Sequence, residues 1–164
     1  AYKTLDNAKD FISIVTRSSK FQLQIEGLRS FINDAPIRGR IRIYGSGNIS
    51  EILGEEGLNE YAHCEGWKTA DVIFAQSSSF CCLPGYGEGI PHSLVDAICS
   101  GLPVWVSTSD FRDFGFYKVQ GIEAHTYGNW RYLNFSHLAR SNFHFDKINK
   151  DYMRAFRLFV SHKV

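Results

Sequence analysis

PGYGEGIPHSLVDAICSGLPVWV, residues 84–106, combines in one segment the features that indicate the fold class. A glycine-rich loop opens it, and a short helix is expected to begin at Pro91 and to end near Gly101. The apolar residues 103–106 follow and are typical of a buried strand. A loop, a helix and a buried strand in this order indicate an α/β domain.

The start of this helix predicts an anion site. Proline is favoured at the first helical position, because its missing N–H would be unpaired there. The amides of His92, Ser93 and Leu94 follow Pro91 and have no partner within the helix. The helix dipole also favours negative charge at this end. We therefore expect the helix start to bind phosphate.

Two carboxylates flank the predicted anion site. Glu88 lies just before it, and Asp96 lies about one turn above it, with seven residues between the two. An ionised carboxylate only accepts hydrogen bonds, so the pair suits a ligand with hydroxyls on both sides of its phosphates. A nucleotide sugar is such a ligand. Leu94, Val95 and Ile98 form the expected apolar side of the helix.

The rest of the chain alternates apolar runs with helical periodicity. Strands are predicted at 11–15, 41–44, 71–75, 103–106 and 122–127. Helices are predicted at 21–33 with a cap from Ser18 or Ser19, in part of 49–64, and at 146–160. This order predicts a Rossmann-like three-layer α/β domain, with a parallel sheet flanked by helices. Ligands of such sheets bind beyond the carboxyl ends of the strands, here 16–20, 45–48, the loop through Glu88, and 107–110.

Composition narrows the class of protein. The 164 residues predict a single domain, 1–164, with a sizeable core, and 44% of them are hydrophobic. A formal net charge of +1 gives no nucleic-acid footprint. No apolar run reaches the roughly 18–20 residues that span a bilayer, and no signal peptide is visible. Because the chain begins at Ala1 without methionine, we expect a fragment or a processed product.

Cysteine usage favours a reducing compartment. We expect reduced, semi-buried thiols rather than a disulfide framework, and a zinc site is disfavoured because no pair shows ligand spacing. The sequence therefore predicts no metal site. The four cysteines, none in C-x-x-C spacing, are Cys64, Cys81, Cys82 and Cys99.

The segment EGIPHSLVDAICSGLPVWVST, residues 88–108, resembles the signature of the retaining glycosyltransferases with two Rossmann-like domains, the GT-B enzymes of the group 1 family. The usual form of that signature is E-G-x-[PG]-x-x-L-x-E-A-x-[AS]-x-G-x-P-V. Asp96 stands in place of its second glutamate. The matching residues are Glu88, Gly89, Pro91, Leu94, Ala97, Ser100, Gly101, Pro103 and Val104.

The resemblance extends over roughly residues 10 to 115. FISIVTRSSKFQLQIEGL is similar to the family's strand, Gly-Arg pair and lysine before a helix, with Thr16 in place of the glycine and a shorter Arg-to-Lys spacing. This implies that Arg17 and Lys20 hold the diphosphate of the donor. IRIYGSGN resembles the family's strand and G-x-G turn near the nucleotide, which implies a role for Gly45 and Gly47. YAHCEGWKTADVIFAQSS is similar to the segment in which a helix precedes the ADV strand.

As a whole, the resemblance implies the C-terminal, donor-binding half of a glycosyltransferase, with the N-terminal acceptor half absent from this chain. The implied reaction is metal-independent and cofactor-free transfer of a hexosyl group from a nucleotide-diphosphate sugar to a polysaccharide, lipid-linked or glycoconjugate acceptor. The fragment alone is expected to be inactive. Glu88, Arg17 and Lys20 are the implied catalytic residues. The implied donor-binding residues are Asp96, Gly89, Ile90, His92, Ser93, Gly45 and Gly47.

The implied partners are the nucleotide-sugar donor and, through the missing half, an acceptor glycan or lipid. A cytoplasmic location is expected. The alternative is a cytoplasmic protein in peripheral contact with the inner face of the membrane.

Two other functions remain open. One is a non-catalytic nucleotide-binding or scaffold domain of the same fold, and the other is a nucleotide-sugar epimerase. The glycines at 45 and 47 have an alternative reading as turn residues. Trp67, Trp105 and Trp130 are expected to pack rather than to stack on a ligand.

Overall fold

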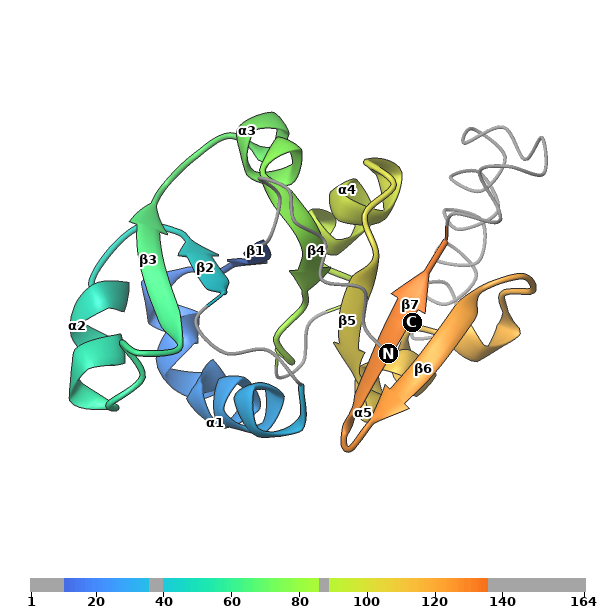
Figure 1. Cartoon of the computed structure of the whole chain (residues 1–164), viewed down its shortest axis with the longest axis horizontal. Helices are drawn as coiled ribbons and strands as arrows, with labels where there is room; N and C mark the ends of the chain where they lie inside the picture. The colour runs from blue at the N-terminus through green and yellow to red at the C-terminus, as the bar shows by residue number, and fades with distance from the viewer. Residues whose placement is uncertain (1–10, 36–39, 86–88, 136–164) are drawn as a thin grey trace, which may run out of the picture.

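The computed structural model describes residues 11–35, 40–85 and 89–135, and these residues form one seven-stranded sheet with helices on both faces (Figure 1). The strands are β1 Phe11–Val15, β2 Ile41–Tyr44, β3 Ala62–Gly66, β4 Ser77–Cys81, β5 Val104–Ser107, β6 Glu123–Tyr127 and β7 Trp130–Asn134. The helices are α1 Ser18–Asp34, α2 Ile49–Glu55, α3 Ala70–Ala75, α4 His92–Cys99, α5 Thr108–Asp113 and the 3-10 helix η1 Phe116–Lys118.

The strand order creates a switch point between β1 and β4. The order is β3-β2-β1-β4-β5-β7-β6, and the first five strands are parallel. β7 pairs antiparallel with β5, and β6 pairs antiparallel with β7. From β1 the chain first builds outward through β2 and β3, then returns to place β4 on the other side of β1. This is the doubly wound, Rossmann-like arrangement, and it confirms the predicted fold class.

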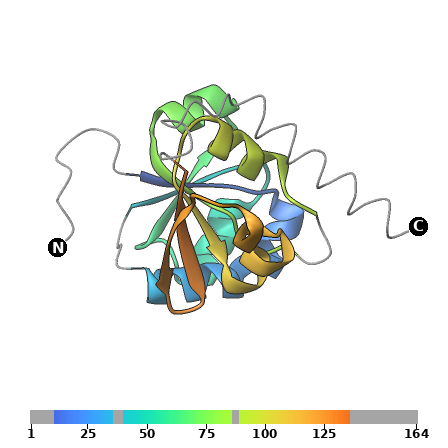
Figure 2. The same ribbon diagram turned by 90° about the vertical axis from the view of Figure 1, so that its right-hand side faces the viewer.

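Each face of the sheet has its own core. Ile12, Ile14 and the buried side of α1 belong to one cluster, and Phe80, Val104 and the buried side of α4 belong to the other. Strand β5 shows the alternation that a two-sided burial requires, because Trp105 packs in the first cluster while its neighbours Val104 and Val106 pack in the second. Figure 2 shows α3 and α4 on one side of the strands and α1 on the other.

The predicted strand at 71–75 is wrong, since Ala70–Ala75 is the helix α3. The strand of this region is β4, Ser77–Cys81, which was not predicted. Two of its three serines are buried with their hydroxyls satisfied: Ser77 donates to the carbonyl of Ile73 at 2.6 Å, and Ser79 accepts from the indole of Trp105 at 3.3 Å. Hydrogen bonding therefore allows a polar run to occupy a central strand.

Other differences are smaller. Helix α1 begins at Ser18 with Arg17 as its N-cap and no side-chain capping bond, so the expected cap from Ser18 or Ser19 is wrong. On α4, Leu94, Ala97 and Ile98 are buried, and Val95 is only half-buried. Strands β3 and β7 were not predicted. The predicted helix at 146–160 lies outside the described residues. No helix in the described part of the chain is long and apolar enough to cross a membrane.

Trp67 is not a packing residue. Trp105 and Trp130 are 2% and 1% exposed, as expected, whereas Trp67, just after β3, is 73% exposed. We therefore expect acrylamide to quench one tryptophan strongly and two weakly. Trp67→Phe is expected to remove most of the quenchable emission, as measured by a Stern–Volmer titration. Strong quenching that persists in this variant would contradict the burial of the other two.

Candidate functional site

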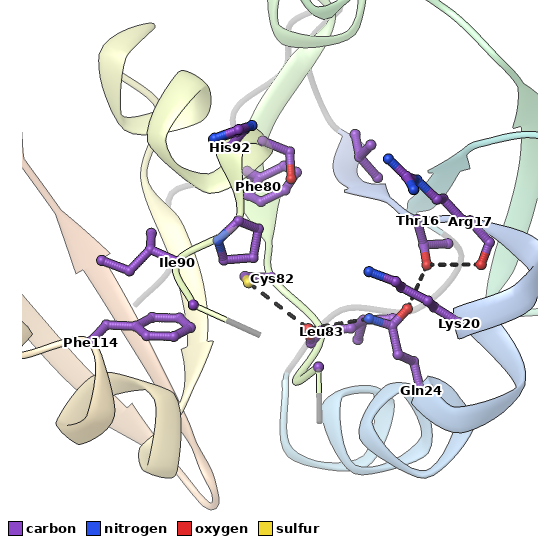
Figure 3. A pocket seen from close by; sticks show the side chains of 15 residues that line it. Thr16, Arg17, Lys20, Gln24, Phe80, Cys82, Leu83, Ile90, His92 and Phe114 are labelled. Carbon is purple, nitrogen blue, oxygen red and sulfur yellow. Dashed lines mark hydrogen bonds between the residues drawn. The ribbon is translucent and has the colours of Figure 1, made fainter. Parts of the chain in front are cut away.

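A pocket of about 550 Å³ opens at the carboxyl ends of β1 and β4, at the switch point of the sheet (Figure 3). This is where parallel α/β sheets bind ligands, since the helices that follow the two strands depart to opposite faces. The lining residues come from four places: the end of β1 with the first turns of α1, β4 with the segment after it, the start of α4, and the end of α5. They include Thr16, Arg17, Lys20, Gln24, Phe80, Cys82, Leu83, Gly89, Ile90, His92, Ser93 and Phe114.

The α1 side of the pocket carries two cations. Arg17 is the exposed N-cap of α1, and its carbonyl accepts the N–H groups of Lys20 and Phe21 at 3.0 and 2.9 Å. Lys20 lies in the first turn, and Figure 3 shows its amine directed from α1 into the pocket. The short Arg-to-Lys spacing thus places both side chains at the start of one helix.

The α4 side presents backbone amides. Pro91 is extended, with φ −64° and ψ 141°, and is the N-cap rather than the first helical residue. Its carbonyl accepts the N–H groups of Leu94 and Val95 at 3.1 and 3.3 Å, so Leu94 is not an open donor, contrary to expectation. His92 and Ser93 precede it and line the pocket, and no acceptor for their amides occurs among the described residues. Two donors and the positive end of the helix dipole therefore face the pocket.

One neutral amide joins the β1–α1 junction to the segment after β4. The Thr16 hydroxyl donates to Oε1 of Gln24 at 2.5 Å, and Nε2 of Gln24 donates to the carbonyl of Leu83 at 3.5 Å. Thr16 follows β1 and Leu83 follows β4, so Gln24 bridges the switch point. The sequence analysis missed Gln24. Its signal was its spacing, since a residue four positions after Lys20 lies on the same side of the helix.

The remaining wall is apolar and holds an inert thiol. Phe80, Ile90 and Phe114 line it beside Cys82, which is 4% exposed. Burial, and secondly the negative charge of Asp110, raises the pKa of Cys82 to about 12. The thiol therefore stays protonated at neutral pH and is no nucleophile. All four cysteines are free, as expected.

The two candidate glycines of the β2–α2 turn do not line the pocket. A Cβ on Gly45 would overlap the backbone oxygen of Thr16 and come within 2.8 Å of Cδ1 of Ile49. Gly47 has φ +96°, and a Cβ there would overlap the side chain of Ser18. The close approach of this turn to the β1–α1 junction accounts for both glycines without a ligand. Their part in donor binding stays a prediction.

The structure describes one of the two signature carboxylates. Asp96 is exposed on α4 and does not line the pocket, although it lies one turn beyond His92. Glu88 lies outside the described residues. Ser107, at the end of β5, caps α5 by accepting the N–H of Asp110 at 3.0 Å, which gives the polar residues after this strand a structural role. Within the ranges the structure describes, no three His, Cys, Asp or Glu side chains form a metal-binding group.

Comparisons with known proteins show a distant likeness to a solved structure. No protein-family model matches the sequence, and no curated protein matches it. Among solved structures, the chain is similar to the pneumococcal O-GlcNAc transferase GtfA in complex with UDP and GlcNAc, with a TM-score of 0.42 and 21% identity. The likeness covers 60% of this chain and 21% of the GtfA chain, so this chain matches about a fifth of that structure. What the pocket binds is inferred below from its own residues.

Proposed function

We propose that this chain is the donor-binding domain of a glycosyltransferase and that its pocket holds the diphosphate of a nucleotide sugar. The observation that supports this most is that cations and backbone amides face each other across the pocket at the switch point. Arg17 and Lys20 stand at the start of α1, and the amides of His92 and Ser93 stand at the start of α4, on opposite sides of one pocket. Fixed cations and open amides around a cavity suit a diphosphate.

In the proposed reaction, the nucleoside diphosphate leaves with growing negative charge. Preorganised donors lower the barrier, because they need no reorganisation when that charge develops. The guanidinium of Arg17 offers forked donors, and Lys20 acts as a point charge. The His92 and Ser93 amides take the opposite side of the diphosphate. In this scheme these groups supply the positive charge that a divalent metal would otherwise bring.

The remaining roles come from the family resemblance. Glu88 is proposed to orient hydroxyls of the transferred hexose, and Asp96 to hold the ribose. Gly89 and Ile90 lead into the start of α4 and line the pocket, which supports their proposed contact with the donor. Retention of the anomeric configuration and the acceptor class rest on the resemblance alone.

Thermal melting of this chain with UDP, GDP, ADP and CMP, each with and without magnesium, tests the proposal. A ligand at about 100 times its Kd stabilises the fold by about 2.7 kcal/mol, which raises the Tm of a domain of this size by about 5–10 °C. We expect one nucleoside diphosphate to produce such a rise, equally with and without magnesium. No shift with any of the nucleotides would count against a donor site in this chain, and a shift that needs magnesium would count against fixed cations as the charge partners.

A further inference from the structure

We propose that Gln24 binds the diphosphate directly, as a neutral donor held in position by Thr16 and Leu83; this inference rests on the proposed function. Three observations lead to it: the orientation of the amide, the contacts between α1 and the segment after β4, and the place of Gln24 beside the two cations.

The orientation of the Gln24 amide is fixed from both ends. A backbone carbonyl only accepts hydrogen bonds, so the nitrogen of the amide must face Leu83. The oxygen then faces Thr16, and the hydroxyl of Thr16 is the donor of that 2.5 Å bond. Thr16 is 8% exposed and Gln24 is half-buried, so the bond is partly shielded from water. The amide therefore does not turn freely, which lowers the entropy cost of using it to bind a ligand.

The segment after β4 is seated on α1 at two successive turns of the helix. Gln24 donates to Leu83, and three residues later Gly27 faces Pro84. A Cβ on Gly27 would lie only 3.0 and 3.2 Å from Cδ and Cγ of Pro84, so a glycine lets the two segments approach closely. These two contacts fix the distance between α1 and the segment after β4, and Gln24 makes one of them.

Gln24 also has a second N–H group, and its amide nitrogen lies on the pocket side of α1 (Figure 3). An amide nitrogen carries two N–H groups, and in the described residues the carbonyl of Leu83 is the single acceptor assigned to it. Gln24 lines the pocket one helical turn after Lys20, and Figure 3 shows its amide nitrogen on the pocket side of α1. A phosphate oxygen held by Arg17 and Lys20 is the acceptor that this second N–H fits.

Calorimetric titration of this chain with inorganic pyrophosphate, and with UDP, GDP and ADP, tests the inference. Gln24→Met keeps the length of the side chain and removes the donors, and we expect it to raise the Kd about tenfold, as for one hydrogen bond to a charged group. Because Gln24 is neutral, the dependence of Kd on ionic strength should stay that of the wild type. A merely structural role would displace Arg17 and Lys20 and so alter that dependence.

Gln24→Glu and a matched control complete the test. Gln24→Glu keeps the acceptor for Thr16 but sets a negative charge towards the ligand, and we expect it to raise the Kd about 100-fold at low ionic strength and less as salt rises. Gln22→Glu makes the same change at an exposed position of α1, and its Kd should stay within about twofold of the wild type. Melting of each variant without ligand shows that it is folded, and if Gln24→Met fails to fold, Gln24→Glu decides.

The outcomes separate this inference from the proposed function. Wild-type binding with an unchanged Kd in the Gln24 variants, or an equal loss in Gln22→Glu, would overturn the role of Gln24 alone. If the wild type binds neither pyrophosphate nor any of the three nucleotides, the proposed function falls, and the role of Gln24 falls with it.

Discussion

Arg17→Ala is expected to weaken binding of the nucleoside diphosphate by about 10- to 100-fold. The side chain lies at the N-cap of α1 and lines the pocket, where the proposed site needs a forked cation. A hydrogen bond to a charged group contributes about 1.5–3 kcal/mol, and each 1.4 kcal/mol is tenfold in Kd. Calorimetric titration of wild type and variant measures the loss directly.

Arg112→Ala is the matched control for that prediction. Arg112 is 73% exposed on α5, and its ion pair with Asp113 at 3.2 Å lies at the surface, where such pairs contribute little. The variant removes the same charge from the chain and should keep the Kd within about twofold. Equal losses in the two variants would mean that net charge, not the pocket, attracts the nucleotide, and an unchanged Kd in Arg17→Ala would remove Arg17 from the site.

Gly45→Ala is expected to destabilise the fold strongly, by about 3 kcal/mol. The added Cβ would overlap the backbone oxygen of Thr16, and backbone cannot swing aside as a side chain can. Both segments are tied in place, since Gly45 donates to the carbonyl of Gly66 and Thr16 donates to that of Tyr44, each at 3.0 Å. Urea unfolding gives the change in the free energy of unfolding.

Gly57→Ala separates this overlap from the general cost of replacing a glycine. Gly57 has φ +67°, and its Cβ would meet nothing within 4 Å. Only the left-handed backbone is then penalised, which costs about 1–2 kcal/mol. If Gly45→Ala lowers the free energy of unfolding no more than Gly57→Ala does, the β2–α2 turn does not approach the β1–α1 junction as closely as described.

Three of the five parallel strands could be predicted because they are short, largely apolar runs. FISIV and IRIY were predicted correctly as the strands β1 and β2. The strand predicted at 103–106 is β5, Val104–Ser107. The same rule failed at DVIFA, which is apolar but forms α3. Its helix start is visible in retrospect, since Asp71 lies in the first turn and a hydrogen bond from the Thr69 side chain lowers its pKa. A run of four apolar residues does not by itself distinguish a buried helix from a strand.

The strands β3 and β7, which were not predicted, lie where the apolar pattern of the sequence is weak. β3, with the sequence AHCEG, pairs with β2 at the edge of the sheet, and only its first residue is buried. β7 follows a two-residue turn at Gly128 and Asn129, with Tyr127 paired to Trp130. Gly128 has φ +55°, which is typical of the tight hairpin turns, so the Gly-Asn pair was a usable signal.

The candidate site could be predicted in part. The start of a helix has a local sequence pattern, whereas a contact between residues far apart in the sequence has none. Arg17, Lys20, His92 and Ser93 all follow the ends of strands or open helices, and all line one pocket. The bond from Gln24 to Leu83 joins residues 59 positions apart, which no local pattern encodes. The polar Thr16 after β1 makes its short hydrogen bond, of 2.5 Å, with that amide.

The central claim is that a nucleoside diphosphate binds between the starts of α1 and α4, and backbone amide NMR of the 18.7 kDa chain tests it most directly. The chain is titrated with the nucleotide that raises the Tm most, and the ¹⁵N–¹H shifts are followed residue by residue. The account predicts saturable shifts that are largest at residues 16–20 and 89–93 and negligible at the β6–β7 hairpin. Shifts centred away from the β1–β4 switch point, or none with any of the nucleotides, would contradict it.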